Sequence, residues 1–252
     1  MPTITGTSAI DRLIGTSEAD IIYGLEGDDV LIGGSGFDRL IGGPGADQLI
    51  GGDGGAEADY SGSGAAVNIN LVATKTGTGT GGDAQGDTLT GIHKIIGSAF
   101  NDTITGDAGF TFEGGAGDDI YIVPFSTVII EAQNGGNDEI RTTNNSYSII
   151  VKDNIERLTY IGTGNARLIG NALDNVITGG QSNDQLYGYT GDDVLVGNGG
   201  GDLLDGGEGF DAVSYINSND GVAVNLASNT SSGGHATGDV LRGIESLLEQ
   251  IL

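Results

Sequence analysis

The chain has 252 residues, of which 49 are glycine and none is cysteine, and its formal net charge at pH 7 is −26. This charge disfavours nucleic acid and anionic membranes as partners, and the lack of cysteine excludes disulfides, thiolate metal sites and thiol chemistry. No apolar run approaches the roughly 18 residues of a membrane helix, and the N-terminal residues lack the pattern of a cleaved signal peptide. We therefore expect no membrane insertion, and any export would use a route that does not read the N-terminus.

Residues 6–50 consist of five consecutive nine-residue units, GTSAIDRLI, GTSEADIIY, GLEGDDVLI, GGSGFDRLI and GGPGADQLI. Each unit has aspartate at its sixth position and leucine or isoleucine at its eighth. The glycine-rich part of a unit can reverse the chain because glycine adopts positive φ without steric cost. The apolar triplet predicts a short strand that must stack on its neighbours. A stretched unit ending at Asp59 is expected to close this first block, residues 1–60.

The middle of the chain alternates between spacers and a shorter block. Residues 61–96 form a spacer, residues 97–122 carry the units GSAFNDTIT and GGAGDDIYI, and residues 123–169 form a second spacer. In that second spacer the apolar runs STVIIEA and YSIIV predict strands. The threonine-rich run TKTGTGTGG, residues 74–82, is expected to be a flexible loop rather than a flat ligand-binding ladder.

A second main block spans residues 170–214, with the units GNALDNVIT, GGQSNDQLY, GYTGDDVLV, GNGGGDLLD and GGEGFDAVS. Residues 215–252 then repeat the first spacer, so that Tyr215 matches Tyr60 and Leu226 matches Leu71 at a separation of 155 residues. We expect the two tyrosines to cover the ends of the block cores. The final stretch, GIESLLEQIL, is the only candidate for a short helix.

Nine-residue units with one strand each predict a flattened all-β solenoid in which two units form one coil of eighteen residues. Position-eight side chains then point inward, and position-six aspartates stack in rows eighteen residues apart. Asp11, Asp29 and Asp47 are expected along one edge, and Asp20 and Asp38 along the other. Stacked carboxylates repel by roughly 1–4 kcal/mol a pair. A divalent cation between turns would reverse this repulsion, and Ca²⁺ suits a cage of carboxylates and turn carbonyls better than Mg²⁺ does.

The units GGSGFDRLI, GGPGADQLI and GGAGDDIYI match the nonapeptide G-G-x-G-x-D-x-U-x, and the chain thereby resembles the RTX (repeats-in-toxin, haemolysin-type) calcium-binding repeat proteins. The resemblance implies a right-handed parallel β-roll or β-helix solenoid that binds several Ca²⁺ ions. It also implies export by the type I secretion machinery and folding outside the cell, either secreted or on the bacterial surface.

The resemblance further implies which residues hold the ions. The side-chain ligands are position-six aspartates, and the other ligands are backbone carbonyls of the glycine-rich turns. On this pattern Asp11 is expected to form only half a site, because its turn lacks two glycines, and Asn175 is expected to weaken its cage. The implied aspartates are Asp20, Asp29, Asp38, Asp47, Asp102, Asp119, Asp184, Asp193, Asp202 and Asp211, and the implied carbonyls are those of Gly24, Glu26, Gly33, Ser35, Gly42, Pro44, Gly188, Thr190, Gly197 and Gly199.

Other interpretations of these residues are less specific. Aspartate can cap a turn through local hydrogen bonds, but capping does not require a strict nine-residue spacing. The position-five acids Asp28, Asp118 and Asp192 are interpreted as solvated. No catalytic motif is present, neither a metalloprotease H-E-x-x-H helix nor a G-x-S-x-G elbow, so the chain is not expected to be an enzyme.

Three roles stay open at this point. The chain could be a calcium-dependent structural or secretion module, an adhesin that binds polysaccharide or a cell-surface glycan, or the non-catalytic repeat part of a larger secreted enzyme. The end of the chain also leaves two interpretations, a fragment of a longer protein or an uncleaved C-terminal export signal.

Overall fold

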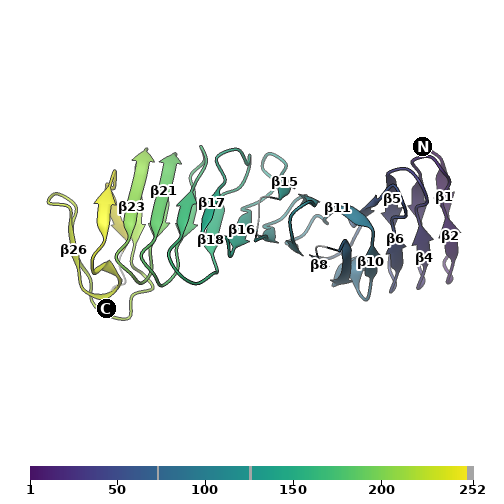
Figure 1. The fold of residues 1–252 in the computed structure, drawn as a ribbon, viewed down its shortest axis with the longest axis horizontal. Coiled ribbons are helices and arrows are strands. Elements are labelled where there is room, and N and C mark those ends of the chain that lie inside the picture. Colours follow the sequence, from purple (N-terminus) through teal and green to yellow (C-terminus); the bar gives the residue numbers. More distant parts are fainter. Residues whose placement is uncertain (73, 125–126, 249–252) are drawn as a thin grey trace. The chain divides into compact units, whose positions relative to one another are not determined.

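The computed structural model describes residues 1–72, 74–124 and 127–248, and these residues form strands and turns with two short 3₁₀ segments, η1 (Gly82–Ala84) and η2 (Gly234–Ala236). The chain divides into two compact units, Met1–Gly136 and Asn137–Leu252. In each unit the strands stack side by side as a parallel β-solenoid (Figure 1). The predicted all-β solenoid is thus confirmed. No helix among the described residues is long and apolar enough to cross a membrane.

In the first unit, successive strands alternate between two sheets, except that β8, β9 and β10 all belong to the same sheet. One sheet has the order β1-β3-β5-β7-β11-β13-β15, and the other runs β2-β4-β6-β10-β9-β8-β12-β14 within this unit. The parallel register pairs Ile22 with Leu40 and Leu31 with Leu49, so equivalent positions stack every second nine-residue unit. The strands are β1 (Thr3–Thr5), β2 (Arg12–Ile14), β3 (Ile21–Tyr23), β4 (Val30–Ile32), β5 (Asp38–Ile41), β6 (Gln48–Ile50), β7 (Ala56–Asp59), β8 (Asn68–Val72), β9 (Thr76–Thr80), β10 (Thr88–Thr90), β11 (Ile92–Ile96), β12 (Thr103–Gly106), β13 (Thr111–Glu113), β14 (Ile120–Ile122) and β15 (Val128–Ile130).

The second unit repeats this arrangement. One set of strands has the order β16-β18-β20-β22-β24-β28, the other has the order β17-β19-β21-β23-β27, and β25 pairs with β26. Leu195 pairs with Val213, and Leu186 pairs with Leu204. The strands are β16 (Glu139–Thr142), β17 (Ser146–Ser148), β18 (Arg157–Tyr160), β19 (Arg167–Ile169), β20 (Val176–Thr178), β21 (Gln185–Thr190), β22 (Val194–Val196), β23 (Leu203–Glu208), β24 (Ala212–Ser214), β25 (Ala223–Asn225), β26 (Thr230–Ser232), β27 (Val240–Arg242) and β28 (Ser246–Leu248).

The core of each unit is a ladder of position-eight side chains. In a three-residue strand such as β4, the central residue is buried and its two neighbours are partly exposed. Full burial of one leucine or isoleucine contributes about 1.5–3 kcal/mol, so the ladder is a large apolar contribution to the stability of the turns. The position-eight residues with no exposed surface are Ile22, Leu31, Leu40, Leu49, Ile104, Tyr121, Ile177, Leu186, Leu195, Leu204 and Val213.

The spacers differ from the expectation in two places. The threonine-rich run is not a loop, because residues Thr76–Thr80 form β9, which pairs antiparallel with both β8 and β10. Its glycines allow close packing, since a Cβ on Gly79 would lie 2.8 Å from the side chain of Ala84.

The C-terminal helix candidate is also wrong within the described residues. Ser246–Leu248 form β28 on the edge of β24, where Leu247 pairs with Val213. Residues 249–252 of that candidate lie outside the described residues, as does Ser126 at the start of the predicted strand STVIIEA.

Candidate metal centre

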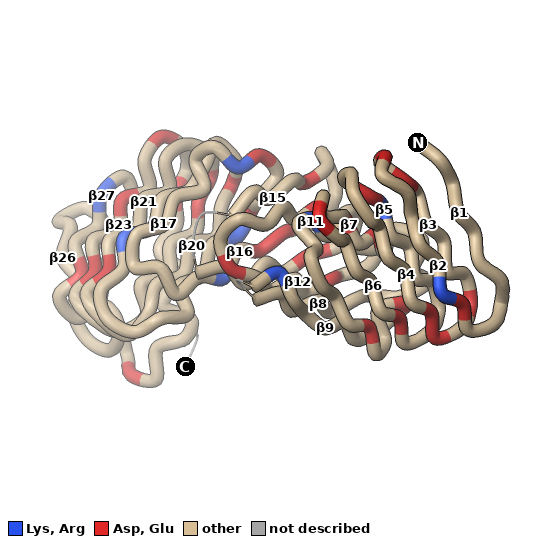
Figure 2. Tube along the Cα trace, turned by 45° about the vertical axis from the view of Figure 1, so that its right-hand side comes forward, with Lys and Arg blue, Asp and Glu red and all other residues tan. Residues whose placement is uncertain are grey.

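The position-six aspartates form rows along the edges of the solenoid, connected by hydrogen bonds. The backbone N–H of Asp29 donates to Oδ1 of Asp47 at 2.8 Å, and the N–H of Asp20 donates to Oδ1 of Asp38 at 2.9 Å. The N–H of Asp11 donates to Oδ1 of Asp29 in the same way. Each pair is eighteen residues apart, as the unit length predicts. Figure 2 shows acidic residues in successive turns beside β2, β4 and β6.

The second block has equivalent rows. The N–H of Asp193 donates to Oδ1 of Asp211 at 2.9 Å, and the N–H of Asp184 donates to Oδ1 of Asp202 at 2.7 Å. Asn175 donates to Oδ1 of Asp193 at 2.7 Å. One carboxylate oxygen of each receiving aspartate is therefore held by the backbone of the previous turn on its edge.

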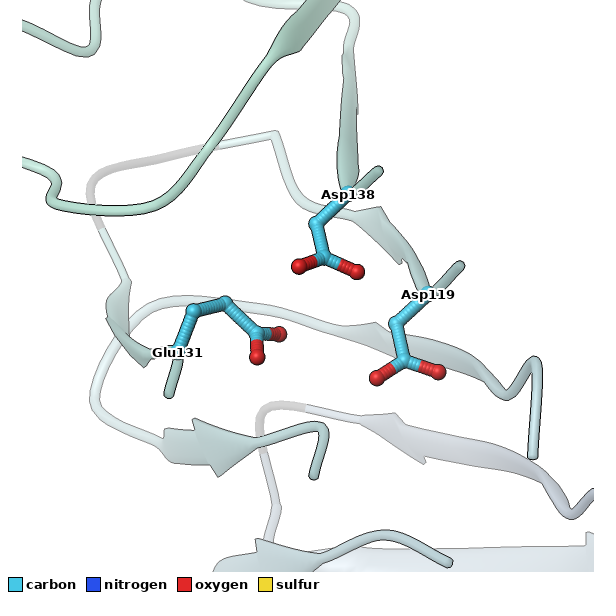
Figure 3. Close-up of side chains that lie close together, drawn as sticks. All are labelled: Asp119, Glu131 and Asp138. Atoms are coloured by element: carbon cyan, nitrogen blue, oxygen red, sulfur yellow. The ribbon is translucent and has the colours of Figure 1, made fainter. Parts of the chain in front are cut away.

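The short block holds the two remaining predicted aspartates. The N–H of Asp102 donates to Oδ1 of Asp119 at 2.7 Å. Oxygens of Asp119 and Glu131 also lie within 4.8 Å of each other, and Figure 3 shows both side chains. The hydroxyl of Tyr121 donates to Glu131. Glu131 was not among the residues predicted from the sequence, because it lies in a spacer without the nine-residue pattern.

The rows continue into the spacers, through residues that the sequence analysis missed. Asp87 accepts the N–H of Asp47 at 2.8 Å, and Asp239 accepts the N–H of Asp202 at 2.8 Å. Their second oxygens accept the hydroxyls of Tyr60 and Tyr215, at 2.9 and 2.7 Å. The available signal was the aspartate-x-leucine tail, DTL at 87–89 and DVL at 239–241, which matches the tail of a unit. The two tyrosines, predicted only to cover the cores, hydrogen-bond the last carboxylate of a row.

Most of the predicted position-six aspartates have one carboxylate oxygen with no hydrogen-bond partner among the described residues. The aspartates are buried in the turns, and among the described residues no donor reaches their Oδ2 atoms. A buried acceptor without a partner costs about 1–3 kcal/mol, so several in one solenoid indicate that a ligand belongs there. The side chains with an unpartnered Oδ2 are Asp29, Asp38, Asp47, Asp193, Asp202 and Asp211, and Asp20 has an unpartnered Oδ1.

The pKa values of the same aspartates also indicate that a ligand belongs beside them. Burial raises the pKa of Asp47, Asp193 and Asp202 to about 7, although a backbone N–H from the adjacent turn opposes the rise. Neighbouring carboxylates raise these pKa values further, Asp87 in the case of Asp47. Burial also raises the pKa of Asp38 and Asp211. The charged forms are therefore unfavourable unless positive charge lies close to them.

The surroundings of the free oxygens fit a hard cation. A Cβ on Gly24 would lie 2.5 Å from Oδ2 of Asp29 and 2.5 Å from the carbonyl oxygen of Gly42, in the next turn on that edge. Gly188 is placed in the same way against Asp193 and the carbonyl of Gly206. Each is a cradle of oxygens that any side chain would fill. Oxygen-only sets of carboxylates and carbonyls suit Ca²⁺.

The predicted carbonyls are in two situations. The carbonyls of position-one glycines face the glycine at position one of the preceding turn on their edge. The carbonyl of Gly24, for example, lies 2.7 Å from a Cβ placed on Gly6. The same contact joins Gly33 to Gly15, Gly42 to Gly24, Gly188 to Gly170 and Gly197 to Gly179. The carbonyl of Pro44 accepts the N–H of Gly27 at 3.0 Å. A metal-ligand role for Pro44, and for Glu26, Ser35, Thr190 and Gly199, stays a prediction.

Three predicted ligands differ from the rest. An oxygen of Asp20 accepts the N–H of Thr16 at 2.5 Å, an oxygen of Asp102 accepts the N–H of Ser98 at 2.5 Å, and an oxygen of Asp184 accepts the N–H of Gly180 at 2.6 Å. The donor lies four residues earlier, in the same turn. These carboxylates are therefore hydrogen-bonded by their own turns.

The parallel strands and the periodic rows of buried carboxylates define the class of this protein as a β-solenoid repeat protein. A family model described as RTX calcium-binding nonapeptide repeat (4 copies) matches residues 5–40, 24–55, 94–109, 160–195 and 181–213. The chain therefore belongs to the RTX calcium-binding nonapeptide repeat family. The matched segments cover both main blocks and the beginning of the short block. No curated protein sequence matches the chain.

Proposed function

We propose that the chain is an extracellular calcium-binding module whose folding is coupled to binding of Ca²⁺ in its stacked turns. The observation that carries this proposal is the set of buried Oδ2 atoms without hydrogen-bond partners, each beside a glycine cradle. Bound Ca²⁺ would supply positive charge to the carboxylates of successive turns. Binding free energy would then become folding free energy.

The proposed setting is outside the cell, after export through the type I secretion machinery. Extracellular calcium modules tolerate individual sites of roughly 10⁻⁴–10⁻³ M. A chain with a formal net charge of −26 would be only marginally stable where calcium is scarce, because its carboxylates repel one another. The solenoid acts in this proposal as a non-catalytic scaffold, either alone or as the repeat part of a larger secreted enzyme.

Isothermal titration calorimetry tests the binding proposal. The chain, first treated with chelator, is titrated with Ca²⁺ and in parallel with Mg²⁺. We expect multi-site binding of Ca²⁺ with millimolar or tighter affinity and much weaker binding of Mg²⁺. A variant in which Asp29, Asp193 and Asp211 are changed to asparagine should bind fewer ions. Equal stoichiometry in the variant would contradict the assignment of these residues.

A specific observation supports a second candidate function, glycan binding. The second unit has a cavity of 420 Å³ whose lining includes Tyr160, Thr163, Thr178, Gln181 and Asn198 and contains no charged side chain. Neutral hydroxyl and amide groups beside an aromatic ring suit a neutral sugar better than a charged ligand. One lining residue, Asn198, lies in the turn of the second block that ends at Asp202, so ordering of that turn by Ca²⁺ would shape the cavity.

A glycan array probed with and without Ca²⁺ tests this candidate. The proposal expects calcium-dependent binding to neutral glycans, reduced by Gln181→Ala. Matched binding by the variant would remove the cavity from consideration.

A further inference from the structure

The turns that precede position six have two different backbone conformations. In one group, the residues at positions two and four both have positive φ, for example Gly34 and Gly36 at 104° and 103°, and Gly207 and Gly209 at 107° and 148°. In this conformation the position-two N–H does not reach the carboxylate of the same turn, and the Oδ2 atoms of Asp38 and Asp211 accept no hydrogen bond from the described residues. We call these open turns. Within the described residues they end at Asp29, Asp38, Asp47, Asp119, Asp193, Asp202 and Asp211.

In the other group, neither residue has positive φ, and the N–H of position two donates to the position-six side chain. Thr7 donates to Asp11 at 2.6 Å, and Asn171 donates to Asn175 at 2.8 Å. Where position two has a side-chain oxygen, this oxygen also accepts the N–H of position four, as Thr16 does from Glu18 at 3.1 Å. We call these closed turns, and they end at Asp11, Asp20, Asp102, Asn175 and Asp184.

The residue at position four separates the two groups completely. Every open turn has glycine there, and the closed turns have Ala9, Glu18, Phe100, Leu173 or Ser182. Position two does not separate them. The closed turn that ends at Asp184 has glycine at position two, Gly180, and still donates its N–H to the carboxylate.

The converse case involves open turns without glycine at position two. Leu25, Tyr189 and Asn198 occupy that position with φ of 82°, 94° and 64°. A leucine or tyrosine in this region is strained. Glycine at position four therefore accompanies the open conformation even where position two opposes it.

We infer that the residue at position four decides whether a turn binds a cation, an inference that rests on the proposed calcium function. With glycine there, the turn opens, and in the two main blocks the buried Oδ2 atom is left for a cation. With any of the other residues present, the turn closes and its own N–H occupies the oxygen that an open turn leaves for a cation. Asp20, Asp102 and Asp184 are then structural carboxylates rather than calcium ligands, and the open turns are the cation sites.

Closed turns precede open turns in every block. Both main blocks begin with two closed turns and continue with three open turns, and the short block has one closed turn followed by one open turn. Each block thus starts with turns that need no cation. These turns present a hydrogen-bonded edge, such as the N–H of Asp20 on Oδ1 of Asp38, to the first open turn of the same edge.

A single substitution tests the inference by gain of a site. Ser182→Gly converts GGQSND into GGQGND, the full repeat pattern, without touching a carboxylate. Ser182→Ala is the matched control, because alanine also disfavours positive φ. The readout is the number of Ca²⁺ ions bound per chain, measured by equilibrium dialysis with elemental analysis.

We expect Ser182→Gly to bind one more Ca²⁺ ion per chain than the wild-type protein, and Ser182→Ala to bind the same number as wild type. An unchanged number in Ser182→Gly, or an equal gain in both variants, would overturn the inference. A reverse variant, Gly200→Ser, should bind one ion fewer. If the wild-type chain bound no Ca²⁺ at all, the proposed function itself would fail, which is a distinguishable result.

Discussion

Asp38→Asn should stabilise the chain in chelator, and most or all of that stabilisation should be lost in calcium. Oδ1 of Asp38 accepts the N–H of Asp20 at 2.9 Å, and its Oδ2 has no partner among the described residues. Asparagine keeps the first acceptor, removes the charge and supplies a donor beside the carbonyl of Gly51, which lies 2.8 Å from a Cβ placed on Gly33. Asn175 shows the same chemistry, because its Nδ2 donates to the carbonyl of Ile155 at 3.1 Å.

The change in unfolding free energy differs between the calcium-free and the calcium-bound chain. In chelator, loss of an unpartnered buried acceptor should raise the free energy of unfolding by about 1–3 kcal/mol. In calcium, loss of one site removes about 1.4 kcal/mol of stabilisation when free Ca²⁺ is ten times Kd, and about 2.7 kcal/mol at a hundred times Kd. The calcium-induced gain in stability should therefore be smaller in the variant by about that amount.

Urea unfolding followed by circular dichroism, in chelator and in excess Ca²⁺, measures both numbers. Asp220→Asn is the control, since Asp220 is exposed in a spacer turn outside the aspartate rows. The control should change neither condition measurably. Equal destabilisation by Asp38→Asn in chelator and in calcium would refute the reasoning, because it would show that the carboxylate acts only as a hydrogen-bond acceptor.

Three further predictions use other parts of the structure. In chelator, stability should rise as the pH falls from 8 to 5. The folded-state pKa values of Asp47, Asp193 and Asp202 are about 7, above the ordinary 3.8, so the stability that protonation of these groups contributes is lost as the pH rises through 7. A fall in stability from pH 8 to pH 5 in urea unfolding would contradict this prediction. Tyr215→Phe removes the hydroxyl that donates to Asp239 and should cost about 1–3 kcal/mol in unfolding free energy; an unchanged urea midpoint would count against the buried pair. Leu40→Ala, at a fully buried ladder position, should cost about 2–5 kcal/mol, and a cost below 1 kcal/mol in the same assay would show that the ladder is not the core.

Much of the architecture could be predicted from the sequence because its period is short and strict. A nine-residue unit leaves room for one turn and one three-residue strand, so the inward position of Leu31 and the pairing of Asp29 with Asp47 follow from counting. The spacers lack this constraint. There the antiparallel strand β9 and the acceptor role of Asp87 depend on pairing between segments that the period does not relate.

The candidate site was only partly predictable, for a reason that lies in the backbone. Asp38 and Asp184 occupy the same position of their units and look equivalent in sequence. Their difference is the direction of one N–H group, which depends on the φ angles of the turn. The missing glycine at position 182 is visible in the sequence, but its effect on that N–H could be seen only in the structure.

The central claim is that calcium binding and folding are coupled, and circular dichroism of the intact chain during a calcium titration tests it most directly. Starting in chelator, the account predicts a cooperative gain of β-structure as Ca²⁺ is added, with no comparable gain from Mg²⁺ at the same concentration. A chain equally folded in chelator and in calcium, with the same urea midpoint in both, would contradict the account.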